Sequence, residues 1–160
     1  MSLTENEKAF MRQAIALAKE AVANGDHPFG ALLVKDGVVV LTAVNTIHSD
    51  NDVTRHAELN LVSQAARQFT PEFLAACTLV TSTEPCAMCA GAIYWSGISR
   101  VVFGCAAATL GRHLGAIAGD DFLIPCEEIF ARGTRPITVV GPVLEEEGTA
   151  VHQQYWPQFE

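Results

Sequence analysis

Two short clusters of metal-binding residue types constrain the fold of this chain more than any other feature. His56 and Glu58 form the first cluster, and Cys86 and Cys89 form the second, in the segment Glu-Pro-Cys-Ala-Met-Cys. One imidazole and two thiols are ligands that zinc prefers, and three protein ligands with a fourth position open are typical of a catalytic zinc. The chain must therefore fold so that two segments about 30 residues apart meet at one point.

The hydrophobic pattern predicts an α/β protein in which helices and strands alternate around a mixed sheet. The chain of 160 residues is long enough for one domain, residues 1–160, with a substantial core. An Asp36-Gly37 hairpin turn joins the first two expected strands. Residues 45–54 are too polar for a regular element, and residues 104–121 carry no clear pattern. Helices are expected over residues 4–24, 55–67, 85–95, 125–131 and, broken, 144–159, with a short piece from residue 70, and strands over 31–35, 38–44, 78–81, 100–105 and 137–140.

Both clusters fall at expected helix starts, where partial positive charge and free amide groups favour thiolates. Glu58 is then free to carry protons instead of binding the metal. The combination H-x-E with P-C-x-x-C is the signature of zinc-dependent nucleobase deaminases. In that chemistry the carboxylate takes a proton from water, protonates a ring nitrogen and finally protonates the amino group, which leaves as ammonia. The pattern therefore predicts Glu58 as the catalytic acid and base.

Other interpretations of the same residues are open at the level of sequence. A C-x-x-C pair also occurs in redox sites and as half of a structural zinc site. A closed structural site needs a fourth ligand, for which the candidates are Cys77, Cys105 and His48. Glu84 precedes Pro85 and is expected to orient the ligands. The remaining histidines are expected in surface or capping positions: His27, His48, His113 and His152.

Charge and composition restrict the partners of the chain. The formal net charge is −8, and the ten basic residues are scattered, whereas nucleic-acid surfaces need clustered Lys and Arg. No apolar run approaches the roughly 20 residues of a membrane-spanning helix, and the polar first residues are unlike a signal peptide. An odd number of cysteines suits a reducing compartment. We therefore expect a cytoplasmic protein that binds neither membranes nor nucleic acids.

At these motifs the chain resembles the cytidine deaminase-like superfamily, above all its guanine deaminase and tRNA-adenosine deaminase branch. The matching segments are residues 27–31 (His-Pro-Phe-Gly-Ala), Asn45, 55–58, 83–92 and 101–104. The resemblance implies a three-layer α/β/α sandwich with a central mixed five-stranded sheet. It also implies one zinc ion per subunit, held by His56, Cys86 and Cys89, and a homodimer.

Within that branch, Phe29 after Pro28 and the residues 93–95 are similar to bacterial guanine deaminases. Asn45 stands eleven residues before His56, the spacing of the Asn that holds the base in those enzymes. Asp121 resembles a further acidic residue of that group, and the aromatic C-terminal segment resembles one that closes the pocket. The substrate contacts implied in this way are Phe29, Asn45, Ala57, Trp95, Asp121 and Tyr155.

The resemblance thus implies hydrolytic deamination of a free nucleobase or nucleoside, with guanine converted to xanthine and ammonia as the first expectation. Two alternatives keep the chemistry and change the substrate, namely a tRNA adenosine deaminase and a deaminase of cytosine or another amino-heterocycle. A third alternative is a zinc-stabilised binding protein that has lost turnover, which predicts a fourth protein ligand.

Overall fold

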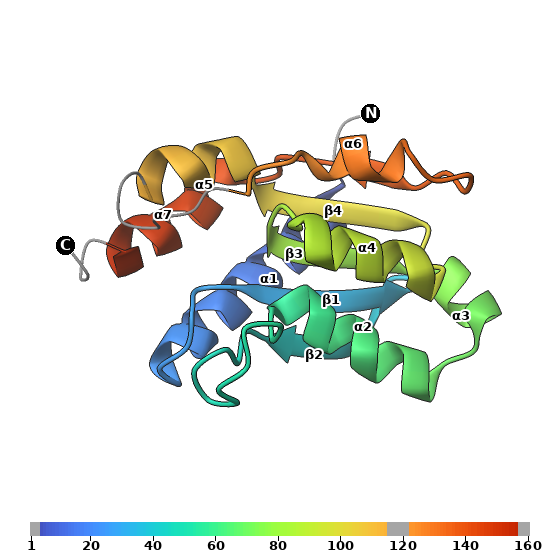
Figure 1. Ribbon diagram of the computed structural model, residues 1–160, viewed down its shortest axis with the longest axis horizontal. Coiled ribbons are helices and arrows are strands. Elements are labelled where there is room, and N and C mark those ends of the chain that lie inside the picture. Colours follow the sequence, from blue (N-terminus) through green and yellow to red (C-terminus); the bar gives the residue numbers. More distant parts are fainter. Residues whose placement is uncertain (1–3, 115–121, 157–160) are drawn as a thin grey trace.

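Five strands form one mixed sheet between two layers of helices in the computed structural model, which describes residues 4–114 and 122–156 (Figure 1). The strand order is β2-β1-β3-β4-β5. Strand β1 is antiparallel to both of its neighbours, whereas β3, β4 and β5 run parallel. The strands are β1 (Gly30–Lys35), β2 (Val38–Val44), β3 (Thr78–Thr83), β4 (Arg100–Cys105) and β5 (Thr138–Val140). The predicted α/β/α sandwich with a mixed five-stranded sheet is confirmed.

Helices cover both faces of this sheet. Helices α1 (Glu5–Ala23) and α7 (Glu145–Tyr155) pack on one face, and α5 (Ala107–Leu114) lies against α7. Helices α2 (Ala57–Gln68) and α4 (Ala87–Ser96) cover the other face, with α3 (Pro71–Ala75) beside α2 and α6 (Cys126–Phe130) beside α4. No helix in the described ranges is long and apolar enough to cross a membrane.

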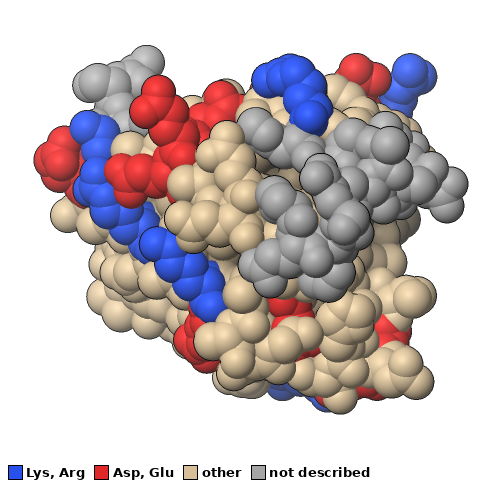
Figure 2. Space-filling view, turned by 90° about the vertical axis from the view of Figure 1, so that its left-hand side faces the viewer, with Lys and Arg blue, Asp and Glu red and all other residues tan. Residues whose placement is uncertain are grey.

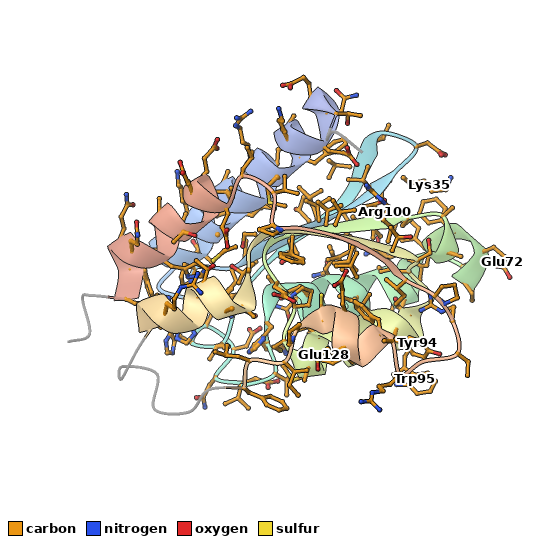
Figure 3. The ribbon with its side chains drawn as sticks, turned by 90° about the horizontal axis from the view of Figure 1, so that it is seen from above. Lys35, Glu72, Tyr94, Trp95, Arg100 and Glu128 are labelled. Carbon is orange, nitrogen blue, oxygen red and sulfur yellow. The ribbon has the colours of Figure 1, made fainter. Side chains whose placement is uncertain are left out.

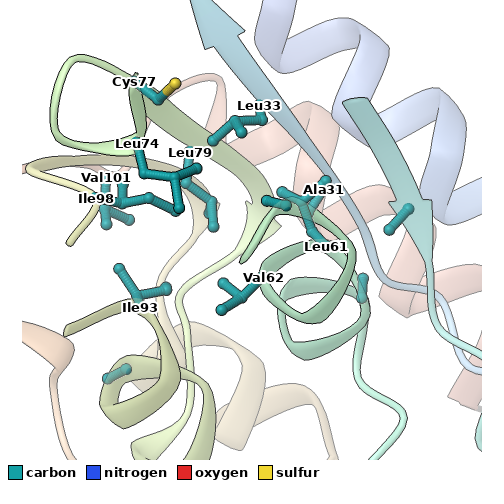
Figure 4. Close-up of a cluster of buried hydrophobic side chains, with 14 of the residues drawn as sticks. Ala31, Leu33, Leu61, Val62, Leu74, Cys77, Leu79, Ile93, Ile98 and Val101 are labelled. Atoms are coloured by element: carbon teal, nitrogen blue, oxygen red, sulfur yellow. The ribbon is translucent and has the colours of Figure 1, made fainter. Parts of the chain in front are cut away.

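The larger core lies between the sheet and helices α2 and α4 (Figure 4). It contains Leu33 and Leu79 from the strands and Leu61 and Ile93 from the helices, all fully buried. The second core lies under α1 and α7 and includes Met11 and Val102. Alternate residues of each strand therefore serve opposite cores, as expected for a sheet covered on both sides.

Local signals in the sequence account for several element boundaries. The Thr4 hydroxyl accepts a hydrogen bond from the Glu7 amide and the Glu7 carboxylate accepts one from the Thr4 amide, so the capping box begins α1. Asp36 and Gly37 both have positive φ, which suits the tight turn between β1 and β2. Gly30 lets α1 pack directly on β1, because a Cβ there would lie 2.5 Å from the Leu17 Cβ.

Four helices differ from the expectation. Helices α2 and α4 begin about two residues later than predicted, because His56 and Cys86 have extended backbone and act as N-caps. Part of the unassigned stretch 104–121 forms α5. Helix α7 is continuous over Glu145–Tyr155, although a broken helix was expected.

Strand ends converge at one edge of the sheet. The start of β1 at Gly30 pairs with the end of β2 at Val44, and the end of β3 at Thr83 pairs with the end of β4 at Cys105. Because β1 is antiparallel to β3, all four ends face the same side. The Cys86 segment follows the end of β3 directly, and the Thr46 amide after β2 donates to the Arg55 carbonyl, so both predicted clusters lie at this edge.

Candidate active site and metal centre

The two clusters meet because each belongs to a helix start at this edge. His56 is the N-cap of α2 and Cys86 is the N-cap of α4, and neither side chain makes a capping hydrogen bond. His and Cys are poor substitutes for the Ser, Thr, Asp or Asn that normally cap helices. The two side chains instead point toward each other, with 3.5 Å between the Cys86 Sγ and the His56 Nδ1.

The ligand atoms of His56, Cys86 and Cys89 all lie within 4.8 Å of one another. A tetrahedral zinc with Zn–S near 2.3 Å and Zn–N near 2.0 Å needs ligand separations of roughly 3.5–3.8 Å, so the cluster fits this metal after a small adjustment. Among residues 4–112 and 122–156, no other His, Cys, Asp or Glu joins the group. The described part of the chain thus supplies three ligands, the number found in catalytic sites.

The candidates for a fourth ligand lie elsewhere. Cys77 directly precedes β3 and is therefore at the opposite edge of the sheet. The Cys105 thiol lies 3.5 Å from the hydroxyl of Thr149 in α7, which donates to it. His48 packs its ring against His27, with 4.7 Å between the ring centroids.

The two thiols of the site are not equivalent. The hydrogen bond from the Cys89 thiol, with a further one from His56, outweighs burial and lowers the pKa of Cys86 to about 4. The same bond to Cys86, together with burial, raises the pKa of Cys89. The hydrogen bond with Cys86 raises the pKa of His56 against the effect of burial. One thiolate is therefore already present at neutral pH, and zinc binding releases the proton of the second thiol.

Glu58 lies in the first turn of α2 and is 4% exposed. Burial raises the pKa of its carboxyl, and the nearby Cys86 raises it further. The Thr81 hydroxyl lies 3.0 Å from the Glu58 Oε1 and 3.0 Å from the backbone carbonyl oxygen of Thr83. A buried carboxyl with a raised pKa beside a metal-binding cluster is suited to accept and return a proton.

Asn45 directly follows β2 and is 1% exposed. Its Oδ1 accepts a hydrogen bond from the Ile47 amide, whereas its Nδ2 is buried and has no hydrogen-bond partner. Its backbone amide donates to the Phe29 carbonyl, which fixes these two residues side by side. A buried amide donor without a partner is costly, so this amide is suited to an acceptor that comes from outside the chain, either a bound molecule or a water.

Glu84 links the thiolate segment to the neighbouring helices. Its two carboxylate oxygens accept hydrogen bonds from the amides of Ala107 and Cys126, at 2.8 and 2.9 Å. These amides belong to the first residues of α5 and α6. Glu84 therefore fixes two helix starts beside the segment that carries Cys86 and Cys89. The sequence predicted an orienting role for Glu84 without indicating its partners.

The other expected substrate contacts differ in burial and in their distance along the chain from the zinc ligands. Ala57 is fully buried between His56 and Glu58, and Tyr155 is 7% exposed in the last turn of α7. Trp95 is 85% exposed near the opposite end of α4 from the ligands, where Figure 3 places it pointing away from the sheet, and its role as a substrate contact stays a prediction. Asp121 lies outside the described residues.

Several residues near the site had no signal in the sequence. The His27 ring packs edge-on against His48, Tyr155 and Trp156, with centroid distances of 4.7, 6.0 and 5.1 Å. Asp26 is 1% exposed and accepts hydrogen bonds from the amides of His48 and Ser49 and from the Ser49 hydroxyl. Because these contacts join segments that are more than 20 residues apart, local periodicity carries no trace of them.

One family model and several deaminases match this chain. The pattern of the cytidine and deoxycytidylate deaminase zinc-binding region matches residues 4–105. A probable cytosine deaminase of Schizosaccharomyces pombe is 39% identical over 156 residues, which are 96% of this chain and 94% of the relative. The guanine deaminase of Bacillus subtilis is 42% identical over 99 residues, 61% of this chain and 64% of that protein.

A tRNA-specific adenosine deaminase of Aquifex aeolicus is 36% identical over 109 residues, 68% of this chain and 70% of the relative. Among solved structures, the guanine deaminase of Nitrosomonas europaea superposes with a TM-score of 0.78 at 27% identity, over 94% of this chain and 84% of that one. The guanine deaminase structure from Bacillus subtilis gives 0.63 at 30% identity, over 99% and 96% of the two chains.

Proposed function

This chain belongs to the cytidine and deoxycytidylate deaminase family of zinc-binding proteins, and we propose that it hydrolyses the amino group of a small free amino-heterocycle, guanine first. Water enters and ammonia leaves, so the amino-bearing carbon becomes a carbonyl carbon and guanine becomes xanthine. The observation that carries the proposal is a buried carboxyl, Glu58, beside three zinc ligands at the sheet edge that also holds the unpartnered amide of Asn45.

The ligands His56, Cys86 and Cys89 would hold the zinc, which when bound makes a water molecule acidic enough to attack near neutral pH. Glu58 takes a proton from water and passes it to a ring nitrogen, and it then takes the proton of the hydroxyl added to the carbon and passes it to the departing amino group. The Thr81 hydroxyl suits both states of this shuttle. It donates to Glu58 as a carboxylate, and it accepts from protonated Glu58 while donating to the Thr83 carbonyl.

The position of Asn45 favours a substrate heterocycle that has a hydrogen-bond acceptor on the edge away from its amino group. Its free Nδ2 offers a donor, and only an acceptor such as a carbonyl oxygen or an unprotonated ring nitrogen satisfies it. Phe29, whose backbone carbonyl accepts a hydrogen bond from the Asn45 amide, is proposed to flank the ring of the substrate. The resemblance to guanine deaminases in sequence and in structure supports guanine as the first substrate.

Cytosine is the second candidate, and one observation favours it. A relative that is 39% identical over 96% of this chain is a probable cytosine deaminase, and cytosine also offers a carbonyl acceptor to Asn45. A tRNA substrate is less well supported, because the net charge is −8. Among the described residues on the face of the molecule that Figure 2 shows, basic side chains are interspersed with acidic ones. We also propose that the chain forms a homodimer.

The test is ammonia release by the zinc-loaded protein with guanine, cytosine, adenine, their nucleosides and a tRNA. We expect turnover of a free base, fastest with guanine, and no effect of added tRNA. Faster release from cytosine would select the second candidate. Turnover of tRNA adenosine alone, or of no amino-heterocycle at all, would refute the proposal.

A further inference from the structure

A buried histidine on the last helix has no part in the reaction described above. His152 lies in α7 and is 1% exposed, although the sequence indicated a surface or capping position. A buried imidazole needs partners for both ring nitrogens. Each ring nitrogen has a hydrogen-bond partner. One partner is Trp156 at the end of the same helix, and the other is Thr83 in β3.

The hydrogen bonds of His152 fix its tautomer. The Trp156 Nε1 lies 3.1 Å from the His152 Nδ1, and because an indole N–H can only donate, Nδ1 is the acceptor. The proton of the neutral ring is therefore on Nε2, which lies 2.8 Å from the Thr83 Oγ1 and donates to it. A chain of hydrogen bonds thus runs from Trp156 through His152 to the end of β3.

This series of hydrogen bonds ends beside the groups assigned to catalysis. Thr83 is followed directly by Glu84, Pro85 and Cys86, and its carbonyl oxygen is one of the two acceptors next to the Thr81 hydroxyl. The other acceptor is Glu58. His152 therefore contacts the strand that supports the proton-carrying carboxyl, without touching that carboxyl itself.

The His152 ring also contacts Phe29, which is proposed above to flank the substrate. The rings of His152 and Phe29 lie 5.2 Å apart and are tilted by 56°. Trp156, which His152 orients, packs against His27 and Tyr155. One imidazole thus touches β3, the residue before β1 and the end of the C-terminal helix.

We propose that His152 is a positioning residue, which ties the end of α7 to strand β3 and thereby sets Phe29 and Trp156 as a wall of the substrate pocket. The kinetic part of this inference rests on the function proposed above, whereas the structural link does not. Removing the link frees the wall and leaves the zinc ligands and Glu58 in place. Substrate binding then weakens, while the chemical step changes little.

The kinetic test compares His152→Leu, His152→Gln, Thr83→Val and Trp156→Phe in the zinc-loaded protein. We expect KM to rise about tenfold in His152→Leu and Trp156→Phe, the effect of one lost buried hydrogen bond, with kcat within about threefold of the original. His152→Gln, which keeps a donor and an acceptor, should recover part of the loss. Losing either hydrogen bond disconnects Trp156 from Thr83. The KM of the double variant His152→Leu/Trp156→Phe should therefore be no higher than that of the poorer single variant. Additive losses, or a fall in kcat at unchanged KM, would overturn the assignment.

A structural readout is independent of any substrate. The sequence has two tryptophans, so a Trp95→Phe background leaves Trp156 as the only indole reporter. In that background His152→Leu should shift the Trp156 emission and increase its quenching by iodide at unchanged zinc content. Unchanged emission and quenching would refute the link even if no substrate is turned over. Absence of turnover in the original chain, with the expected emission change, would refute only the proposed function.

Discussion

The metal side and the substrate side of the site are built in different ways. The metal side comes from two helix starts, and its residues stand within four positions of one another in each cluster. The proposed substrate side gathers Phe29 before β1, Asn45 after β2 and Tyr155 in α7. The Asn45 amide donates to the Phe29 carbonyl, and the Tyr155 ring packs against His27. The first side is therefore a local feature of the sequence, whereas the second exists only after folding. Under the proposed function, the residues for the reaction and the residues for the substrate are therefore encoded separately.

The largest expected effect is loss of the metal. Cys86→Ala should abolish zinc binding at neutral pH and reduce activity to background, because two protein ligands cannot hold a catalytic zinc. Metal content per chain, measured by mass spectrometry together with ammonia release, checks this. The matched control is Cys77→Ser at the opposite edge of the sheet, which should keep the zinc. Equal metal loss in both variants would show that the effect comes from folding.

The next effect separates chemistry from metal binding. Glu58→Gln should lower kcat by roughly 10²- to 10⁴-fold, the usual contribution of a general acid and base, while the zinc content stays at one per chain. Glu128→Gln, on an exposed side chain of α6, is the control and should leave kcat unchanged. Retained activity in Glu58→Gln would remove this residue from the mechanism.

A smaller effect is expected on the substrate side. Asn45→Ala should lower kcat/KM by about 10- to 100-fold through the loss of a buried hydrogen bond, with zinc content unaffected. Trp95→Ala is the comparison variant and should leave kcat/KM within about twofold, because Trp95 is exposed and far from the ligands along α4. Steady-state kinetics on the preferred base decides between them. The reverse ranking would place Trp95 in the pocket and Asn45 outside it.

The smallest effect concerns the loop that carries Asn45. Burial alone would raise the pKa of Asp26, but its hydrogen bonds from Ser49 and His48 outweigh burial and lower the pKa. A lowered pKa contributes stability that is present above the ordinary value, near pH 4, and is lost as the pH falls through the folded-state value. Asp26→Asn should therefore lower the Tm by roughly 2–4 °C at pH 7.

The difference between the two proteins should narrow below about pH 4, as the original carboxyl becomes protonated. Thermal unfolding of both proteins between pH 7 and pH 3 measures this difference. A Tm gap that widens toward acid pH would contradict the assigned direction of the pKa shift.

The same contrast explains what could be predicted from the sequence. Apolar periodicity, the capping box at Thr4 and the turn at Asp36 placed the elements of the sandwich to within a few residues. The candidate zinc ligands and Glu58 could be predicted from the sequence because their spacing within each cluster is local. The positions of Trp95 and His152 could not be found, because an exposed helix face and a buried one depend on what packs against them. The partners of Glu84 and Asp26 belong to segments that only the sheet topology brings near.

The central claim is that His56, Cys86 and Cys89 hold zinc with one position left for reaction. X-ray absorption spectroscopy of the zinc-loaded protein tests it directly. The account predicts two sulfur neighbours near 2.3 Å and two nitrogen or oxygen neighbours near 2.0–2.1 Å, one of which is replaced when an inhibitor binds. Three or four sulfur neighbours, or a first shell that no ligand changes, would contradict it.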